Sequence, residues 1–335
     1  MNYKLSLTAH YIYNPPTPNI RGAFKNPPNP TYQGGIKFEI IRNKTNDGFA
    51  KGVNDSIRQA LAQGFGYIAV VNIHTTVESN YIGELAKVAE SDDKIGVVQA
   101  RMMLDPEKDR ISSLGNVTHF LGFGYCSHYR EKWDEKKFGI RHSAFGIHDI
   151  HYPSGSSMFF KREVLEKVGL LDEEYWMYNE DQEIGWRIWL AGYRCVLAPR
   201  AVMYNKYEFQ RSIEKFYWMD RNRINAILQC YRLPTLLLIF PAFVIMEIGL
   251  ILFSLKTGWF KEKIRVWKYF LTPRKWAYIY AARKRNQSLR KVRDRDIAKM
   301  ISGRIWYQEV GDIKLRLINP VFDLYWRVIR FLIKW

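Results

Sequence analysis

The sequence predicts an α/β fold in which a mostly parallel sheet is flanked by helices and followed by an apolar and basic helical region. Short β-branched runs alternate with helical segments, and this order builds parallel sheets with right-handed crossovers. Near the C-terminus, a long apolar run precedes an excess of Lys and Arg. We therefore expect a Pro-rich lead-in at residues 1–35, an α/β domain at 36–230 and a helical region at 231–335.

The first elements follow from composition and hydrophobic pattern. Residues 14–35 are dense in Pro, Asn and Gly, which disfavour both helices and central strands. A short strand is expected at residues 37–41 and a helix at 54–63. Residues 67–72 form an apolar β-branched run, which is typical of a buried parallel strand.

The second half of the α/β domain repeats this alternation. A helix is expected at residues 81–91 and a strand at 95–100, whereas 101–151 is rich in glycine and aromatic residues and could line an active site as loops. A strand that runs into a helix is expected at 156–169, and a further helix at 180–192. Each of these two helices ends at a glycine, a common helix stop.

The charge of the chain is concentrated near its C-terminus. The formal net charge is +18, and residues 256–335 hold 21 Lys and Arg against 6 Asp and Glu, so an anionic partner is expected. Residues 233–255 are almost wholly apolar and are close to the ~20 residues that cross a bilayer as a helix. Residues 319–335 carry cations at the helical spacing of interfacial helices. These features favour an anionic membrane surface and exclude nucleic acid as the partner.

Two residues argue against a simple membrane span. Pro241 lies near the middle of the apolar segment, and Glu247 would place a carboxylate in hydrocarbon, which is unfavourable. Two interpretations therefore remain: residues 233–255 cross the membrane as one segment, or they lie on its surface as a peripheral helix. The three cysteines form no CxxC pair and the N-terminus lacks a secretory signal, so we expect the cytoplasmic face of the cell membrane.

Five segments carry a recognisable series of motifs. They are NKTNDGFAKGVN at 43–54, VVNIHT at 70–75, GSSMFFKR at 155–162, NEDQEIGWR at 179–187 and YWMDRNR at 217–223. In this order they resemble family 2 glycosyltransferases of the rhamnosyltransferase-like kind. The resemblance implies a GT-A-like (Rossmann-like) nucleotide-sugar fold and an inverting sugar transfer.

The resemblance places the catalytic carboxylates at Glu180 and Asp181. Inverting transfer needs a base within hydrogen-bond reach of the acceptor hydroxyl, and Asp181 matches the family's base. Glu180 would then orient the acceptor or the loop. The alternative is that these carboxylates only stabilise the N-terminus of a helix through its dipole.

Further site residues are implied by the same motifs. Those expected at the nucleotide-diphosphate sugar are Asn46, Gly48, Gly52, Asn54, Asn72, His74, Arg221 and Arg223. Those expected at the acceptor, a lipid-linked or cell-surface glycan, are Gly155, Ser156 and Trp186. Glycines allow close backbone approach to phosphate, and the guanidinium fork matches it. As alternatives, the two arginines are ordinary juxtamembrane charges and Trp186 belongs to the core.

The chain departs from the family's pattern on the donor side. His74 stands where metal-using members carry an Asp, and Asn205 stands where they commonly carry a His. A divalent cation (Mg²⁺ or Mn²⁺), with His74 as a weak ligand, therefore stays an open question, because Mg²⁺ prefers oxygen ligands. No organic cofactor is expected. Residues 1–35 contain no recognisable counterpart of the relatives' first strand, turn and strand, so an inactive membrane-bound glycan-binding or scaffold protein is the alternative function.

Overall fold

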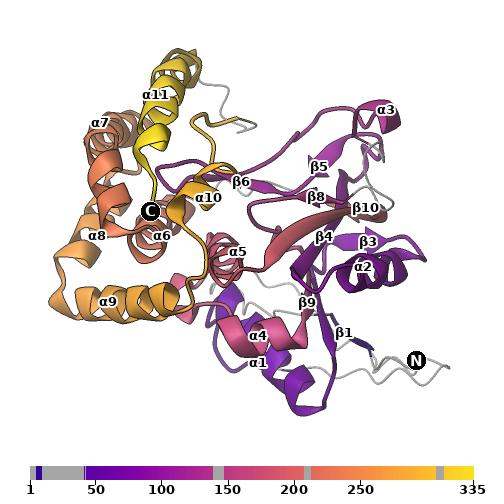
Figure 1. The fold of residues 1–335 in the computed structure, drawn as a ribbon. Coiled ribbons are helices and arrows are strands. Elements are labelled where there is room, and N and C mark those ends of the chain that lie inside the picture. Colours follow the sequence, from indigo (N-terminus) through magenta and orange to yellow (C-terminus); the bar gives the residue numbers. More distant parts are fainter. Residues whose placement is uncertain (1–4, 10–40, 42, 139–146, 207–212, 307–312) are drawn as a thin grey trace, which may run out of the picture.

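The structure is a computed structural model that describes residues 5–9, 41, 43–138, 147–206, 213–306 and 313–335. A sheet flanked by helices forms one side of the molecule, and a layer of C-terminal helices forms the other (Figure 1). The helix α5 (Glu180–Leu190) lies between them. The α/β class is therefore confirmed.

The strand order of the main sheet is β1-β2-β9-β4-β10-β3. These strands are β1 (Leu5–Ala9), β2 (Tyr67–Val71), β9 (Ser157–Lys161), β4 (Ile95–Leu104), β10 (Arg194–Asn205) and β3 (Thr75–Val77). Two short strands, β5 (Ile111–Ser113) and β8 (His148–Asp149), add to β4 and β10, while β6 (Asn116–Thr118) and β7 (Gly124–Cys126) form a separate ribbon.

The sheet is mixed, which corrects the expectation of a mostly parallel one. Only the pairs β1–β2 and β4–β10 are parallel, and β9 runs antiparallel to both β2 and β4. The chain leaves the sheet at the C-terminal end of β4 and returns at the same end of the sheet, where β9 begins. Ser157 consequently pairs with Val71, the last residue of β2, and β9 must run back across the sheet.

The N-terminus supplies a strand that we did not expect. β1 pairs in parallel with β2, with Leu5 opposite Tyr67 and Ala9 opposite Val71. The alternation of Leu and Ser or Thr in LSLTA is a strand pattern, but the Pro-rich composition of the following residues concealed it. The strand expected at residues 37–41 lies, apart from Ile41, outside the described residues.

Four helices cover the two faces of the sheet. α1 (Phe49–Ala62) and α4 (Arg162–Val168) pack on one face, together with α5, and α2 (Tyr81–Glu90) packs on the other. Within β2, Ile68 and Val70 contribute to the first core and Ala69 to the second, as the period of two requires.

The C-terminal helices are α6 (Glu214–Cys230), α7 (Leu233–Thr257), α8 (Phe260–Leu271), α9 (Pro273–Ser288), α10 (Asp294–Ala298) and α11 (Ile313–Leu332). They share a buried core with α5, to which Trp186 and Leu190 contribute. A short helix α3 (Glu135–Phe138) and a 3₁₀ turn (Glu173–Tyr175) complete the described elements. The helical region therefore packs directly onto the element that carries Asp181.

Candidate active site

The side chain of Asp181 is held by two backbone donors. Its Oδ2 accepts a hydrogen bond from the N–H of Gly155 at 2.9 Å, and its Oδ1 accepts one from the N–H of Gln182 at 2.8 Å. Asp181 lies in the first turn of α5, where the helix dipole also favours an anion. Each oxygen keeps a free lone pair, so the carboxylate can still accept a proton from a ligand.

Burial sets the protonation of the two neighbouring carboxyls. It raises the pKa of Asp181 from 3.8 to about 6, although the N–H groups of Gly155 and Gln182 lower it. Burial and then the charge of Asp181 raise the pKa of Glu180 well above 4.5, and its Oε2 is buried without a hydrogen-bond partner. Burial therefore makes both carboxyls harder to ionise than surface carboxyls, and the charge of an ionised Asp181 further disfavours ionisation of Glu180.

The loop before α5 has an unusual backbone. Three of its non-glycine residues have a positive φ, between 60° and 68°: Trp176, Tyr178 and Asn179. Asn222 on α6 holds this loop, because its Nδ2 donates to the carbonyls of Tyr175 (2.9 Å), Met177 (2.9 Å) and Tyr178 (2.7 Å). The position of Asp181 thus depends on a side chain that sequence reasoning missed.

Arg221 and Arg223, which flank Asn222, are both buried and do not face a donor site. The Arg221 guanidinium donates to the carbonyl of Tyr175 at 3.2 Å and to the Asn222 side chain at 2.7 Å. Arg223 pairs with Asp220 at 2.7 Å and with Glu247 on α7. Internal oxygens therefore occupy both guanidinium groups in this structure, and phosphate binding by Arg221 and Arg223 stays a prediction that these contacts do not support.

The NKTNDGFAKGVN segment forms the turn into α1. Asn46 is exposed, and its Oδ1 accepts the N–H of Gly48 at 3.2 Å. Gly48 has φ +89°, and a Cβ added there would lie 2.5 Å from Trp176. This glycine is therefore required by the turn and by the close approach of the loop before α5.

Two further residues of this segment are buried within α1. Asn54 donates from Nδ2 to the carbonyl of Leu171 at 2.8 Å and accepts the N–H of Leu171 at 3.0 Å. Gly52 is also buried. The expectation that Gly48, Gly52 and Asn54 contact the donor is corrected: they join α1 to the segment before α5, and only Asn46 is accessible.

The structure brings five of the predicted residues to one edge of the sheet. Asn72 follows β2, and its N–H donates to the carbonyl of Ser156 at 3.3 Å, while its Nδ2 lies 3.5 Å from Ser156 Oγ. The exposed His74 donates its N–H to Asn72 Oδ1 at 3.4 Å. Since Gly155 binds Asp181, the end of β2 and the start of α5 converge on the turn before β9.

Trp186 lies in the core and not at this edge. Its side chain is fully buried, and its ring packs edge-on against Tyr231 and His151, with centroids 4.8 and 5.2 Å away. Its placement matches the alternative that Trp186 belongs to the core, because this face of α5 packs against the C-terminal helices.

The donor set at this edge does not fit a Mg²⁺ site. No group of three or more His, Cys, Asp or Glu side chains that could hold a metal occurs within the described part of the chain. Asn72 and His74 offer an amide and an imidazole, and the buried Asn205 lies opposite Thr75 in the β10–β3 pair. Of the five predicted residues at this edge, only Asp181 offers a carboxylate, the ligand that Mg²⁺ prefers, and its oxygens already accept the N–H groups of Gly155 and Gln182.

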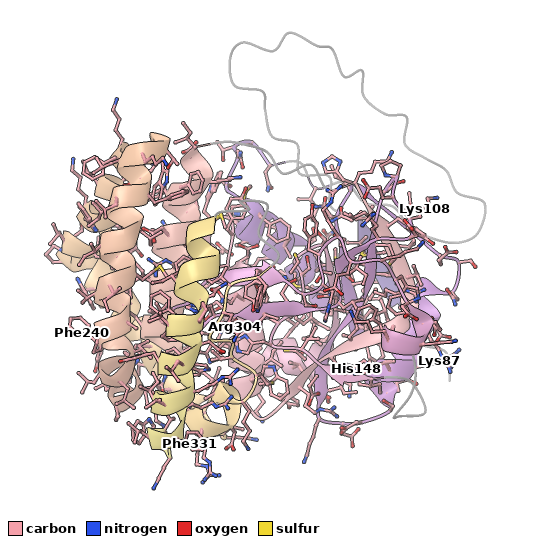
Figure 2. All side chains as sticks on the ribbon, turned by 90° about the horizontal axis from the view of Figure 1, so that it is seen from above. Lys87, Lys108, His148, Phe240, Arg304 and Phe331 are labelled. Carbon is pink, nitrogen blue, oxygen red and sulfur yellow. The ribbon has the colours of Figure 1, made fainter. Side chains whose placement is uncertain are left out.

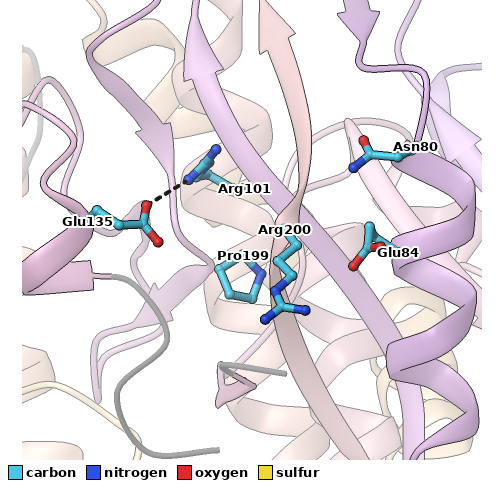
Figure 3. Close-up of a pocket in the computed structure, with 6 residues that line it drawn as sticks. All are labelled: Asn80, Glu84, Arg101, Glu135, Pro199 and Arg200. Atoms are coloured by element: carbon cyan, nitrogen blue, oxygen red, sulfur yellow. Dashed lines mark ion pairs between the residues drawn. The ribbon is translucent and has the colours of Figure 1, made fainter. Parts of the chain in front are cut away.

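A separate cavity of about 330 Å³ lies beside α2. It is lined by Asn80, Glu84, Arg101, Glu135, Pro199 and Arg200. Figure 3 shows the Arg101–Glu135 ion pair in this cavity, with a distance of 3.8 Å between Nη1 and Oε2. None of the predicted site residues lines it.

The comparison with protein families confirms the resemblance over part of the chain. Residues 24–169 match the model of glycosyl transferase family 2. The match contains Asn46, Asn72, His74 and the turn at Gly155, and it ends before Asp181. No curated protein matches the chain.

Several solved structures are similar to this chain at low sequence identity. GalNAc-T7, solved with UDP, GalNAc and Mn²⁺, is 14% identical, with a TM-score of 0.43 over 57% of this chain. The match covers 36% of GalNAc-T7, so this chain spans about a third of its length. The mannosyltransferase PcManGT from Pyrobaculum calidifontis, solved with GDP-Man and Mn²⁺, is 11% identical, with a TM-score of 0.37 over 89% of this chain and 70% of its own. S. aureus TarS is 13% identical, with a TM-score of 0.41 over 88% and 74% of the two chains.

Proposed function

We propose that this chain, which matches glycosyl transferase family 2 over residues 24–169, is an inverting glycosyltransferase with Asp181 as its base. The observation that carries the proposal is the convergence of Asp181 with the turn at Gly155 and Ser156 and with the polar end of β2. This geometry supports an acceptor beside the carboxylate and a donor beside Asn72 and His74.

The proposed step is a single displacement at the anomeric carbon. The acceptor hydroxyl transfers its proton to a free lone pair of Asp181 while its oxygen forms a bond to the anomeric carbon. The bond from that carbon to the nucleotide diphosphate breaks, and the electron pair leaves with the diphosphate. The pKa of Asp181, raised by burial to about 6, leaves it ionised at neutral pH and makes it a stronger base than a surface carboxylate.

In the proposed donor site, amide and imidazole side chains bind the nucleotide diphosphate. Asn46, Asn72 and His74 are polar residues near the turn into α1 and the end of β2. These three side chains include no carboxylate, the ligand that Mg²⁺ prefers. Hydrogen-bond donors from these residues would stabilise the departing diphosphate.

The proposed acceptor is a lipid-linked or cell-surface glycan at the cytoplasmic face of the membrane. Support comes from α7, which is long and apolar enough to cross a bilayer and is mostly unburied. The basic C-terminal region adds electrostatic attraction to anionic lipid.

A second function is favoured by one observation. His74 replaces the carboxylate that metal-using relatives carry, so a non-catalytic glycan-binding or scaffold protein would fit a donor site that no longer holds a nucleotide sugar. This alternative predicts no nucleotide binding.

Calorimetry and a transfer assay distinguish the two functions. The full chain is titrated with UDP, dTDP and GDP, with and without Mn²⁺, and is then incubated with labelled nucleotide sugars and lipid extract. We expect one nucleotide to bind, and Asp181→Asn to retain binding but lose about 10²–10⁴-fold in transfer. The exposed Asp93→Asn is the matched control. Absence of binding by all three nucleotides would exclude the transferase, and full transfer by Asp181→Asn would exclude this base.

A further inference from the structure

One flank of the molecule carries a continuous apolar surface on α7. The helix has 25 residues, and only 11% of its most apolar window is buried. Its most exposed large side chains follow helical spacing along one side: Leu233, Leu237, Phe240, Ile245, Ile248, Leu252 and Leu255. Monomeric soluble proteins rarely expose an apolar patch of this extent, so the surface requires a partner.

The helix α11 extends this surface. Val321, Leu324, Val328 and Phe331 are exposed on one side of α11, at least 57% each. The hydroxyl of Tyr325 donates to the carbonyl of Leu238 at 2.6 Å, which joins α11 to α7. Figure 2 shows α7 and α11 side by side on the flank away from the sheet. We call the exposed sides of these two helices the α7–α11 face.

The inner side of α7 is fixed by an internal charge network. Glu247 pairs with Arg223 on α6 and with Lys263 on α8, whose Nζ lies 2.6 Å from Glu247 Oε2. Lys263 also pairs with Asp220 at 2.7 Å and is fully buried. Moving α7 away from this network would leave two buried cations short of a carboxylate, which is strongly destabilising.

The elements on either side of α7 pack against each other. The helix α9 follows α7 in the sequence, and Leu228 and Tyr231 precede α7. Arg283 on α9 donates to the carbonyls of Leu228 and Tyr231 at 2.6 Å each. A helix that crosses a bilayer once would place α6 and α9 on opposite sides of the membrane. The contacts between them require that both ends of α7 lie on the same side.

We infer that α7 and α11 bind in the plane of an anionic bilayer surface, with the α7–α11 face in the lipid, and that α7 does not cross the membrane. The exposed cations at its rim, Lys256, Arg327 and Lys334, complement anionic headgroups. A second copy on this face would bring the same basic rim against itself. This inference depends on the proposed function only for the idea that the acceptor lies at the membrane. Membrane binding itself can be tested without measuring sugar transfer.

Cysteine labelling tests the topology. Lys87→Cys on α2 and Lys284→Cys on α9 place exposed thiols on elements before and after α7, and the unsubstituted chain gives the background of the native cysteines. A membrane-impermeant maleimide is added to intact spheroplasts and to lysed cells. We expect the two variants to be labelled identically, and labelling from opposite sides would overturn the inference.

Vesicle flotation tests the face itself. The purified full chain is mixed with vesicles of phosphatidylcholine alone or with phosphatidylglycerol. We expect binding that is stronger with phosphatidylglycerol, and Leu237→Glu and Leu324→Glu each to weaken it about tenfold. Val77→Glu, an exposed apolar position on β3, is the matched control and should bind like the unsubstituted chain.

Two results would overturn the assignment of lipid to the α7–α11 face. One is unchanged vesicle binding by both face variants. The other is a dimer in solution that binds no vesicles and that Leu237→Glu dissociates, because the partner would then be a second copy. Nucleotide calorimetry on the same variants shows independently whether the donor site is intact, so failure of the inference is distinct from failure of the proposed function.

Discussion

The carboxylate of Asp181 should destabilise the folded chain at the pH at which it serves as a base. Burial raises its pKa from 3.8 to about 6, so the folded state binds this proton more tightly than the unfolded chain does. At about 1.36 kcal/mol per pKa unit, ionisation costs the folded state about 3 kcal/mol above roughly pH 7. The penalty falls as the pH falls through 6 and is nearly absent below about pH 4.

Asp181→Asn removes this penalty. The amide can accept from only one of the two N–H groups that the carboxylate binds, those of Gly155 and Gln182, and this loss costs about 1 kcal/mol. We therefore expect the variant to be about 2 kcal/mol more stable than the native chain at about pH 8 and no more stable at about pH 4.5. Sugar transfer should fall about 10²–10⁴-fold in the same variant.

Urea unfolding at these two pH values measures the effect. The exposed Asp93→Asn should change the free energy of unfolding by less than about 0.5 kcal/mol at both. An Asp181→Asn chain that is equally destabilised at high and low pH would refute burial as the source of the raised pKa.

Three other substitutions test contacts around the site by urea unfolding. Asn222→Ala leaves three carbonyls of the loop before α5 without their donor and should cost about 3 kcal/mol; an effect below about 1 kcal/mol would show that the loop holds itself. Glu247→Gln breaks a buried charge network and should cost about 3 kcal/mol, and a neutral result would contradict the role given to that network. Gly48→Ala should cost at least about 2 kcal/mol because its Cβ would meet Trp176, whereas Gly64→Ala, with a similar φ and open space, should cost only about 1 kcal/mol.

Local elements were predictable because their signals are local. The helix expected at 81–91 is α2 (Tyr81–Glu90), and the strand expected at 67–72 is β2 (Tyr67–Val71). The direction of β9 was not predictable, because it depends on where the chain returns to the sheet after β4 ends at Leu104. The strand β1 was missed since its five residues precede a long Pro-rich stretch that dominates the composition.

In the candidate site, too, some features could be predicted from the sequence and others could not. The position of Asp181 in the first turn of a helix follows from its motif. The burial of Arg221 and Arg223 does not, because a guanidinium suits a phosphate and an internal oxygen equally well. Asn222 lies in the YWMDRNR motif, but its role could not be predicted, since its partners are backbone carbonyls 44 to 47 residues away whose identity the sequence does not encode.

The four residues from Asp220 to Arg223 link the proposed membrane surface to the proposed base. Asp220 and Arg223 belong to the charge network that fixes the inner side of α7 through Glu247. Asn222, on the same turn of α6, holds the loop that places Asp181. One turn of α6 therefore contacts both α7, which carries part of the α7–α11 face, and the loop that places Asp181. An acceptor anchored in that bilayer surface would need a spacer of defined length to bring its hydroxyl to Asp181, so transfer should depend on that length when the anchor is in a vesicle and not when the acceptor is free in solution.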